Sequence, residues 1–225
     1  MLSTPLYDIT PFSTLDYPDH LAAIFWFGGC NMRCDYCYNK DVVLGTGHIG
    51  TKEALAFLKQ RIGLLDAVVL SGGEATLYND ITTFARQIKT LGFKIKLDTN
   101  GTACDIIQEL LEQSLIDYIA LDYKAPETKF TRITHHKTFQ TFQKTLTLLI
   151  GSNLPFEVRT TLHTDLLDEY DINAIIEDLH VKGYNGIYYI QNFFDTHQTI
   201  GEMASPTKPF DRRKVCPLLH VKFRH

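Results

Sequence analysis

The sequence predicts an α/β fold, an open and partial (β/α)6 barrel of the TIM type with parallel strands. Three observations lead to this prediction: short apolar runs typical of buried strands, a helical stripe of apolar residues after each run, and glycines at several of the junctions. Strict alternation of strand and helix implies parallel strands joined by right-handed crossovers. Six repeats fall short of the eight that a closed barrel needs.

The first half of the chain supplies three of the repeats. Residues 22–27 form a continuous apolar run, as expected of a strand buried on both faces. A helix is expected over 51–65, with Thr51 as its cap, because apolar residues recur there at helical spacing. The next elements are a strand at 67–70, a helix at 81–91 that Gly92 ends, a strand at 93–97 and a helix at 106–111.

The second half continues the same alternation. Its predicted elements are a strand at 118–121, a helix at 139–150 closed by Gly151, a strand at 156–162, a helix at 171–182 and a last strand at 186–190. The tail after Gln191 is rich in loops and receives no assignment.

One domain is expected over 1–225, with a core at about 20–191 and a tail at 192–225, because 225 residues with 44% hydrophobic content can build one sizeable core. The formal net charge of -4 and the absence of Lys/Arg runs predict neither a nucleic-acid surface nor a polybasic membrane patch. No apolar run approaches the ~20 residues that span a bilayer, and no signal peptide is recognised, which favours a cytoplasmic protein.

Three of the five cysteines are crowded into one loop, as Cys30, Cys34 and Cys37. Such a set can ligate a [4Fe–4S] cluster and leave one iron without a protein ligand, which is where chemistry can occur. The alternative is a structural zinc site completed by Cys216 or His20, although the chain has no second cysteine knuckle. Cys104 is most simply a buried or unpaired thiol.

Polar segments follow the other predicted strands, and parallel strands bring their carboxyl ends to one face of the fold. Each has an ordinary alternative: a glycine turn, a helix cap or a surface ion pair. The segments are Ser71-Gly72-Gly73-Glu74, Asp98-Thr99-Asn100-Gly101, Asp122-Tyr123-Lys124, Arg159 to His163, and Gln191.

The pattern Cys-x3-Cys-x-aromatic-Cys after the first strand resembles the signature of the radical S-adenosylmethionine (SAM) superfamily. The resemblance implies two cofactors, a [4Fe–4S] cluster on the three cysteines and SAM on the open iron. It places the aromatic Tyr36 near the adenine, and it gives Gly72, Gly73 and Glu74 the binding of the SAM amino group.

Within that superfamily the chain resembles the glycyl-radical-enzyme activases, most of all the anaerobic ribonucleoside-triphosphate reductase activating proteins, from about Leu15 to Leu162. In related activases the aspartates at the positions of Asp98 and Asp122 help to form a monovalent-cation site beside SAM, and the following lysine, here Lys124, contacts the SAM region. The resemblance also brings Thr99 and Asn100 into the cofactor site. Arg159 and His163 are expected to reach the ribose or carboxylate of SAM.

The implied activity is reductive cleavage of SAM to a 5′-deoxyadenosyl radical, which generates a glycyl radical on a partner enzyme. The resemblance implies anaerobic ribonucleotide reductase as this partner and reduced flavodoxin or ferredoxin as the electron donor. The departures from the pattern are Ala75 for proline, Tyr38 for histidine and Asp19 for glycine. Two alternatives stay open: a small-molecule radical SAM enzyme such as 7-carboxy-7-deazaguanine synthase, and a non-catalytic Fe–S or zinc sensor.

Overall fold

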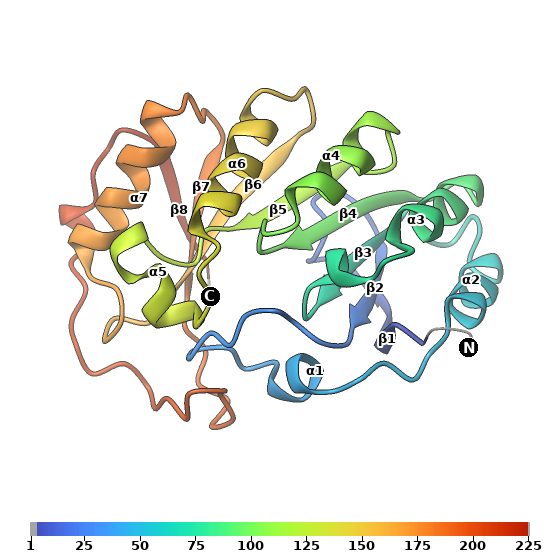
Figure 1. The fold of residues 1–225 in the computed structure, drawn as a ribbon, viewed down its shortest axis with the longest axis horizontal. Coiled ribbons are helices and arrows are strands. Elements are labelled where there is room, and N and C mark those ends of the chain that lie inside the picture. Colours follow the sequence, from blue (N-terminus) through green and yellow to red (C-terminus); the bar gives the residue numbers. More distant parts are fainter. Residues whose placement is uncertain (1–3, 225) are drawn as a thin grey trace. The chain divides into compact units, whose positions relative to one another are not determined.

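A computed structural model describes residues 4–224 of the chain (Figure 1). Strands and helices alternate along most of it, as predicted. In chain order the elements are β1 (Leu6–Ser13), β2 (Ala22–Phe27), α1 (Lys40–Leu44), α2 (Thr51–Lys59), β3 (Ala67–Gly72), the 3-10 helix η1 (Ala75–Leu77), α3 (Ile81–Thr90), β4 (Lys94–Thr99), α4 (Cys104–Glu112), β5 (Tyr118–Asp122), α5 (Glu127–Thr134), α6 (Phe139–Ile150), β6 (Phe156–Leu162), α7 (Glu169–Val181), β7 (Ile187–Asn192), the 3-10 helix η2 (Arg212–Lys214) and β8 (His220–Arg224).

The strands of the described chain follow one another in the sheet in chain order, from β1 to β8. β2 pairs in parallel with β3, and β3 with β4, in unbroken register; β6, β7 and β8 are parallel as well. β1 is antiparallel to β2, with irregular register at two places. The predicted parallel α/β sheet is confirmed, and β1 and β8 are additions that the sequence analysis did not assign.

The described residues divide into two compact units. Unit 1 comprises the residues up to Asn31, Asp41–Thr99 and Ala103–Ile119, and unit 2 comprises Met32–Lys40, Asn100–Thr102 and the residues from Ala120 onward. Single-domain organisation therefore stays a prediction.

In unit 1 the strands present apolar side chains to both faces. On one face Tyr17, Ile24 and Val69 belong to one buried cluster, and Trp26 packs against it. On the other face the ring of Phe25 stacks on Phe84 of α3 at 6.0 Å. Burial on both faces explains why these strands read as continuous apolar runs.

The core of unit 2 is rich in aromatic side chains. Tyr123, which directly follows β5, packs edge-on against Phe142 of α6 at 4.6 Å, and Phe130 of α5 packs against Phe139 at 5.3 Å. The Tyr123 hydroxyl donates to Asp178 of α7 at 2.9 Å. These contacts hold α5, α6 and α7 to the segment that follows β5.

The predicted bounds of one helix were wrong. The helix expected over 51–65 ends at Lys59, and its cap is Gly50 rather than Thr51, without a side-chain hydrogen bond. Gly63 adopts a φ of 78°, which a helix does not allow, so the apolar spacing beyond Lys59 belongs to a turn. α1 and α5 were not predicted.

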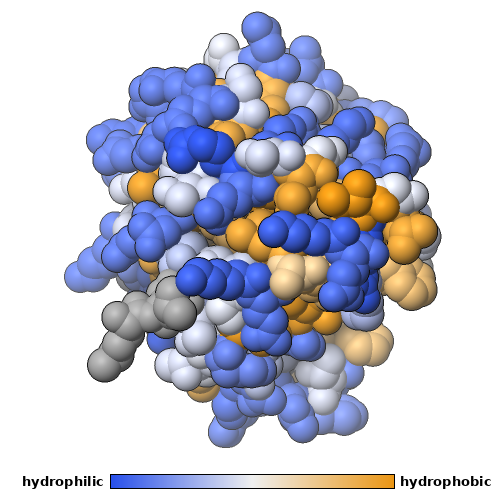
Figure 2. Space-filling model, turned by 90° about the vertical axis from the view of Figure 1, so that its right-hand side faces the viewer, coloured by the Kyte–Doolittle hydropathy of each residue, from blue (hydrophilic) through white to orange (hydrophobic). Residues whose placement is uncertain are grey.

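Some hydrophobic side chains reach the surface. In unit 1 they include Leu15, which is 90% exposed, and Leu64, which is 68% exposed. A space-filling view shows apolar side chains gathered among hydrophilic ones on one face of the molecule (Figure 2). Among residues 4–224 no helix combines the length and the apolar character that crossing a bilayer requires.

Candidate functional site

In unit 1 the turn after β3 is hydrogen-bonded to the segment that ends at Gly29, the residue before Cys30. The Gly73 N–H donates to Phe27 O at 2.8 Å, and the Glu74 N–H donates to Gly29 O at 2.9 Å. A Cβ on Gly73 would lie only 1.8 Å from Gly29 O, and Gly72 has a φ of 110°. No other residue fits both conditions. The glycine pair is therefore required by the close approach of two backbones.

Glu74 is buried with only 2% of its surface exposed, and its carboxylate is held in one orientation. The Oε1 atom accepts hydrogen bonds from the hydroxyls of Thr76 at 2.6 Å and of Thr99 at 2.9 Å. Thr99 lies at the end of β4, so its bond joins the ends of two neighbouring strands. The result is a fixed carboxylate, which can accept hydrogen bonds from an ammonium group.

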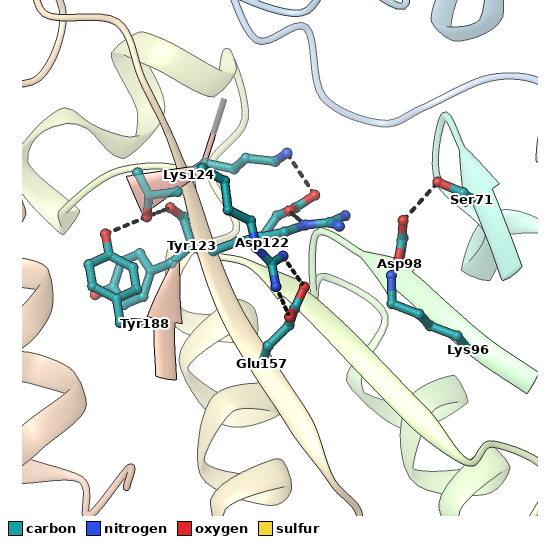
Figure 3. A network of polar contacts seen from close by, with 11 residues as sticks. Ser71, Lys96, Asp98, Asp122, Tyr123, Lys124, Glu157 and Tyr188 are labelled. Carbon is teal, nitrogen blue, oxygen red and sulfur yellow. Dashed lines mark hydrogen bonds and ion pairs between the residues drawn. The ribbon is translucent and has the colours of Figure 1, made fainter. Parts of the chain in front are cut away.

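Asp98 lies next to Thr99, and both of its carboxylate oxygens accept hydrogen bonds. Its Oδ1 accepts from Lys96 Nζ at 2.6 Å and its Oδ2 from the Ser71 hydroxyl at 3.0 Å (Figure 3). Three strand ends of unit 1 that were predicted to converge, Gly29, Ser71 to Glu74 and Asp98-Thr99, are thus joined by hydrogen bonds.

In unit 2 the segment with Cys34 and Cys37 is tied down along its length. The Cys37 N–H donates to Cys34 O at 2.9 Å, which closes a tight turn between the two thiols. The Asp35 N–H donates to Ile133 O at 3.2 Å, and His135 Nε2 lies 2.7 Å from Asp35 Oδ1. The loop is therefore anchored to the end of α5.

The C-terminal tail holds the same segment from another direction. The Ile200 N–H donates to Cys37 O at 3.0 Å, and the Gly201 N–H donates to Asp35 O at 2.9 Å. A Cβ on Gly201 would lie 2.7 Å from the Cβ of Asp35. The tail, which the sequence left unassigned, is part of the support of the cysteine segment.

Two side chains within this segment have raised pKa values. Burial raises the pKa of the Tyr36 hydroxyl well above its usual value, with a further contribution from Cys34. Burial also raises the pKa of the Cys37 thiol, although the charge of Lys124 opposes the rise. The Tyr36 hydroxyl is buried and has no hydrogen-bond partner among residues 4–224. An orphaned buried hydroxyl beside two thiols is consistent with a site built to receive a further group.

Asp122 accepts ion pairs from two cations of unit 2. Its Oδ1 accepts from Arg159 Nε at 2.5 Å and its Oδ2 from Lys124 Nζ at 2.9 Å (Figure 3). Burial works against ionisation of Asp122, but Arg159 and Lys124 outweigh it and lower its pKa to about 2. Burial also disfavours the charge of Lys124, yet Asp122 raises the pKa of that ammonium well above its usual value. All three groups are ionised at neutral pH.

Other predicted site residues make local contacts. Asn100 Oδ1 accepts from the Thr102 hydroxyl at 2.6 Å in a turn of unit 2. His163 is 1% exposed; its Nε2 contacts Ala204 O at 2.9 Å, and its Nδ1 accepts from the Asp165 N–H at 3.3 Å. Both nitrogens of His163 thus bind backbone, one of them in the tail, and its contact with SAM stays a prediction.

His20 and Cys216 are the alternative zinc ligands. His20 packs on Tyr17 with ring centroids 4.3 Å apart, and its two nitrogens lie within 2.8 Å of Lys94 Nζ and Pro18 O. The Cys216 N–H donates to Asn173 in unit 2. Both nitrogens of His20 therefore have partners, whereas the contact of Cys216 is made by its backbone.

Sequence reasoning missed Lys96 and the two tail residues Ile200 and Gly201. A signal for Lys96 exists: in β4 the polar Lys94, Lys96 and Asp98 alternate with Ile95 and Leu97, so they lie on one face of the strand. No local pattern could have found the tail contacts, because they join residues more than 160 positions apart.

Comparison with known proteins gives the family. The model of the radical SAM superfamily matches residues 24–180. The chain belongs to the radical SAM superfamily. It is 36% identical over 191 residues, or 82% of this chain and 78% of the relative, to MJ1227 of Methanocaldococcus jannaschii, provisionally named a glycyl-radical enzyme activating enzyme. It is 29% identical over 103 residues, or 46% of this chain and 47% of the relative, to a 7-carboxy-7-deazaguanine synthase of Thermoplasma acidophilum.

Solved structures support the fold of this radical SAM enzyme. Streptococcus suis SuiB bound to S-adenosylmethionine matches with a TM-score of 0.67 and 15% identity, over 90% of this chain and 52% of SuiB. At that identity the likeness shows the fold alone, and this chain spans about half of SuiB. The predicted partial barrel of the TIM type is confirmed.

The cofactors are those of the family, a [4Fe–4S] cluster and SAM, as the sequence predicted. The residues present fit them: two thiols flank a buried, unpartnered hydroxyl in unit 2, and a fixed carboxylate follows a glycine turn in unit 1. Family membership makes the chain an enzyme, so the non-catalytic sensor has no support.

Proposed function

We propose that the chain is a glycyl-radical-enzyme activase. The support is its 36% identity to MJ1227 over most of both chains, against 29% over less than half of each chain for the 7-carboxy-7-deazaguanine synthase. The partner enzyme would be an anaerobic ribonucleotide reductase and the electron donor reduced flavodoxin or ferredoxin. A cytoplasmic location is part of the proposal, since clustered free thiols suit a reducing compartment.

In this proposal Cys30, Cys34 and Cys37 hold the cluster. When bound, the reduced cluster and SAM supply a 5′-deoxyadenosyl radical, and the protein contributes binding, orientation and exclusion of water. Cys30 directly follows Gly29, whose carbonyl is held by Glu74. This contact is the main support for the proposed SAM site, because it holds the carboxylate-bearing residue Glu74 beside the residue that precedes the proposed cluster ligand Cys30.

The remaining roles follow from charge and position. Gly72, Gly73 and Glu74 would bind the amino group of SAM, with Thr99 as the support of Glu74. Lys124 and Arg159 place two positive charges beside Asp122, which suits the carboxylate of SAM. Tyr36 would lie near the adenine, and Asp98, Asn100 and His163 would support the site.

The test is anaerobic reconstitution with iron and sulfide, reduction with dithionite, addition of SAM and measurement of 5′-deoxyadenosine. We expect product from the unchanged chain and none from Cys34→Ala, while Cys216→Ala retains both iron and product. Loss of iron on Cys216→Ala would contradict the three-cysteine ligand set.

The activase is tested separately, by mixing the reduced protein with an anaerobic ribonucleotide reductase and recording the glycyl radical by electron paramagnetic resonance. A glycyl signal that requires SAM supports it. Formation of 7-carboxy-7-deazaguanine in place of that signal would favour the synthase.

A further inference from the structure

The charge of Asp98 is balanced by a lysine from its own strand. In β4 the side chains of Lys94, Lys96 and Asp98 share one face because strand residues alternate between faces. Lys96 Nζ reaches Asp98 Oδ1 at 2.6 Å. Figure 3 shows the lysine extended along the strand to the carboxylate, with Ser71 on its other oxygen.

This ion pair is inside the protein. The side chain of Lys96 is 3% exposed and that of Asp98 is 12% exposed. Lysine is almost never buried to this degree unless it is paired, because an isolated charge loses its hydration. The ammonium of Lys96 and the carboxylate of Asp98 are therefore each other's counter-ions.

The second aspartate at which a cation is expected is also neutralised. The carboxylate of Asp122 forms ion pairs with both Lys124 and Arg159, so its negative charge is already compensated by side chains of unit 2. A further cation would meet a carboxylate whose oxygens already face two positive charges, which disfavours its binding there.

The residues present therefore do not fit the monovalent cation that the resemblance predicts. A hard cation needs several oxygen ligands with a net negative charge. We propose that Lys96 is a built-in counter-ion of Asp98 that takes the place of a bound monovalent cation, so that this chain binds SAM without one. The SAM part of the proposal rests on the proposed function, whereas the ion pair does not.

The first experiment removes the ammonium and asks whether a cation can replace it. Unfolding temperatures of the unchanged chain, Lys96→Ala and the control Lys94→Ala are compared in potassium chloride and in tetramethylammonium chloride at equal ionic strength. Lys94 is two residues away on the same face and is exposed.

In tetramethylammonium we expect Lys96→Ala to unfold on the order of 10 °C below the unchanged chain, because one partner of a buried pair is left uncompensated. Potassium should restore part of that loss in Lys96→Ala and change neither the unchanged chain nor Lys94→Ala. An unfolding temperature of the unchanged chain that rises with potassium would overturn the proposal, since a cation bound with a Kd near 1 mM raises it by about 5–10 °C at 0.1 M.

The second experiment needs no variant. The unchanged, reconstituted protein is dialysed against rubidium with and without SAM, and bound rubidium and SAM are measured. We expect no saturable rubidium, and SAM affinity that changes less than about twofold between potassium and tetramethylammonium, where a linked cation would change it tenfold or more. One rubidium per chain would refute the proposal, even if Lys96→Ala fails to fold. Absence of SAM binding in every salt would count against the proposed function, while the unfolding experiment would still decide the role of Lys96.

Discussion

Substitution of Gly73 by alanine should damage both the fold and the candidate SAM site. The new Cβ would lie 1.8 Å from Gly29 O and 2.5 Å from Gly29 C, whereas real Cβ contacts stay beyond 3.0 Å. The carbonyl must therefore retreat by about 1.2 Å, the difference between those distances. Because it is backbone, that movement displaces Cys30 as well and breaks the 2.9 Å bond from Glu74.

The expected cost combines overpacking of about 1–3 kcal/mol with about 1 kcal/mol for the lost hydrogen bond. For a chain of this size that lowers the unfolding temperature by about 5–15 °C. Calorimetry measures the shift, and SAM binding to the reconstituted protein should fall at least tenfold. Gly151→Ala is the matched control, since its Cβ would meet neighbours at an ordinary 3.5 Å and leave both quantities unchanged. Equal unfolding temperatures and SAM affinities for Gly73→Ala and Gly151→Ala would refute the reasoning.

Two further predictions concern unit 2. The pKa of Asp122 is about 2, below its ordinary 3.8, so the ionised carboxylate stabilises the fold above pH 3.8 and this contribution is lost as pH falls through 2. Urea denaturation from pH 2 to 6 measures the unfolding free energy of the unchanged chain and of Asp122→Asn. The difference between the two should be constant above pH 5 and shrink by about 2 kcal/mol toward pH 2. A difference independent of pH would contradict the ion pairs. Gly201→Ala places a Cβ 2.7 Å from Asp35 and should destabilise by about 1–3 kcal/mol while lowering the iron bound after reconstitution. Full iron content with an unchanged unfolding temperature would show that the tail does not support the cysteine segment.

The first strands of the parallel sheet, β2 and β3, could be predicted from the sequence because they are buried on both faces. Runs such as Ala22–Phe27 have no polar residue, which is a strong signal for one kind of element. β1 and β8 give weaker signals. β1 contains Pro11 and three polar residues, and in β8 only Val221 and Phe223 alternate with polar residues over a five-residue strand. Their assignment depends on pairing partners that local patterns do not reveal.

The candidate site was predictable as a set of motifs, but not as a set of contacts. The glycine pair at 72–73 fits an ordinary turn equally well until the position of Gly29 is known. His163 illustrates the opposite case: its place at a strand end suggested a ligand contact, whereas its nitrogens bind the backbone of Ala204 and Asp165. A strand-end position restricts where a side chain lies but does not determine its partner.

Lys94 and Lys96 show where local sequence stops being informative. Both are lysines, both lie on one face of β4, and both are flanked by buried apolar residues, yet Lys94 is exposed and Lys96 is 2% exposed. The difference arises from position within the strand. Lys94 is the first residue of β4 and is exposed, whereas Lys96 lies inside the strand and is paired with Asp98. Because burial of a lysine without a partner is so unfavourable, the spacing Lys-x-Asp inside a buried strand is itself a prediction of an internal ion pair. This spacing indicates that Lys96, and not Lys94, forms the ion pair with Asp98.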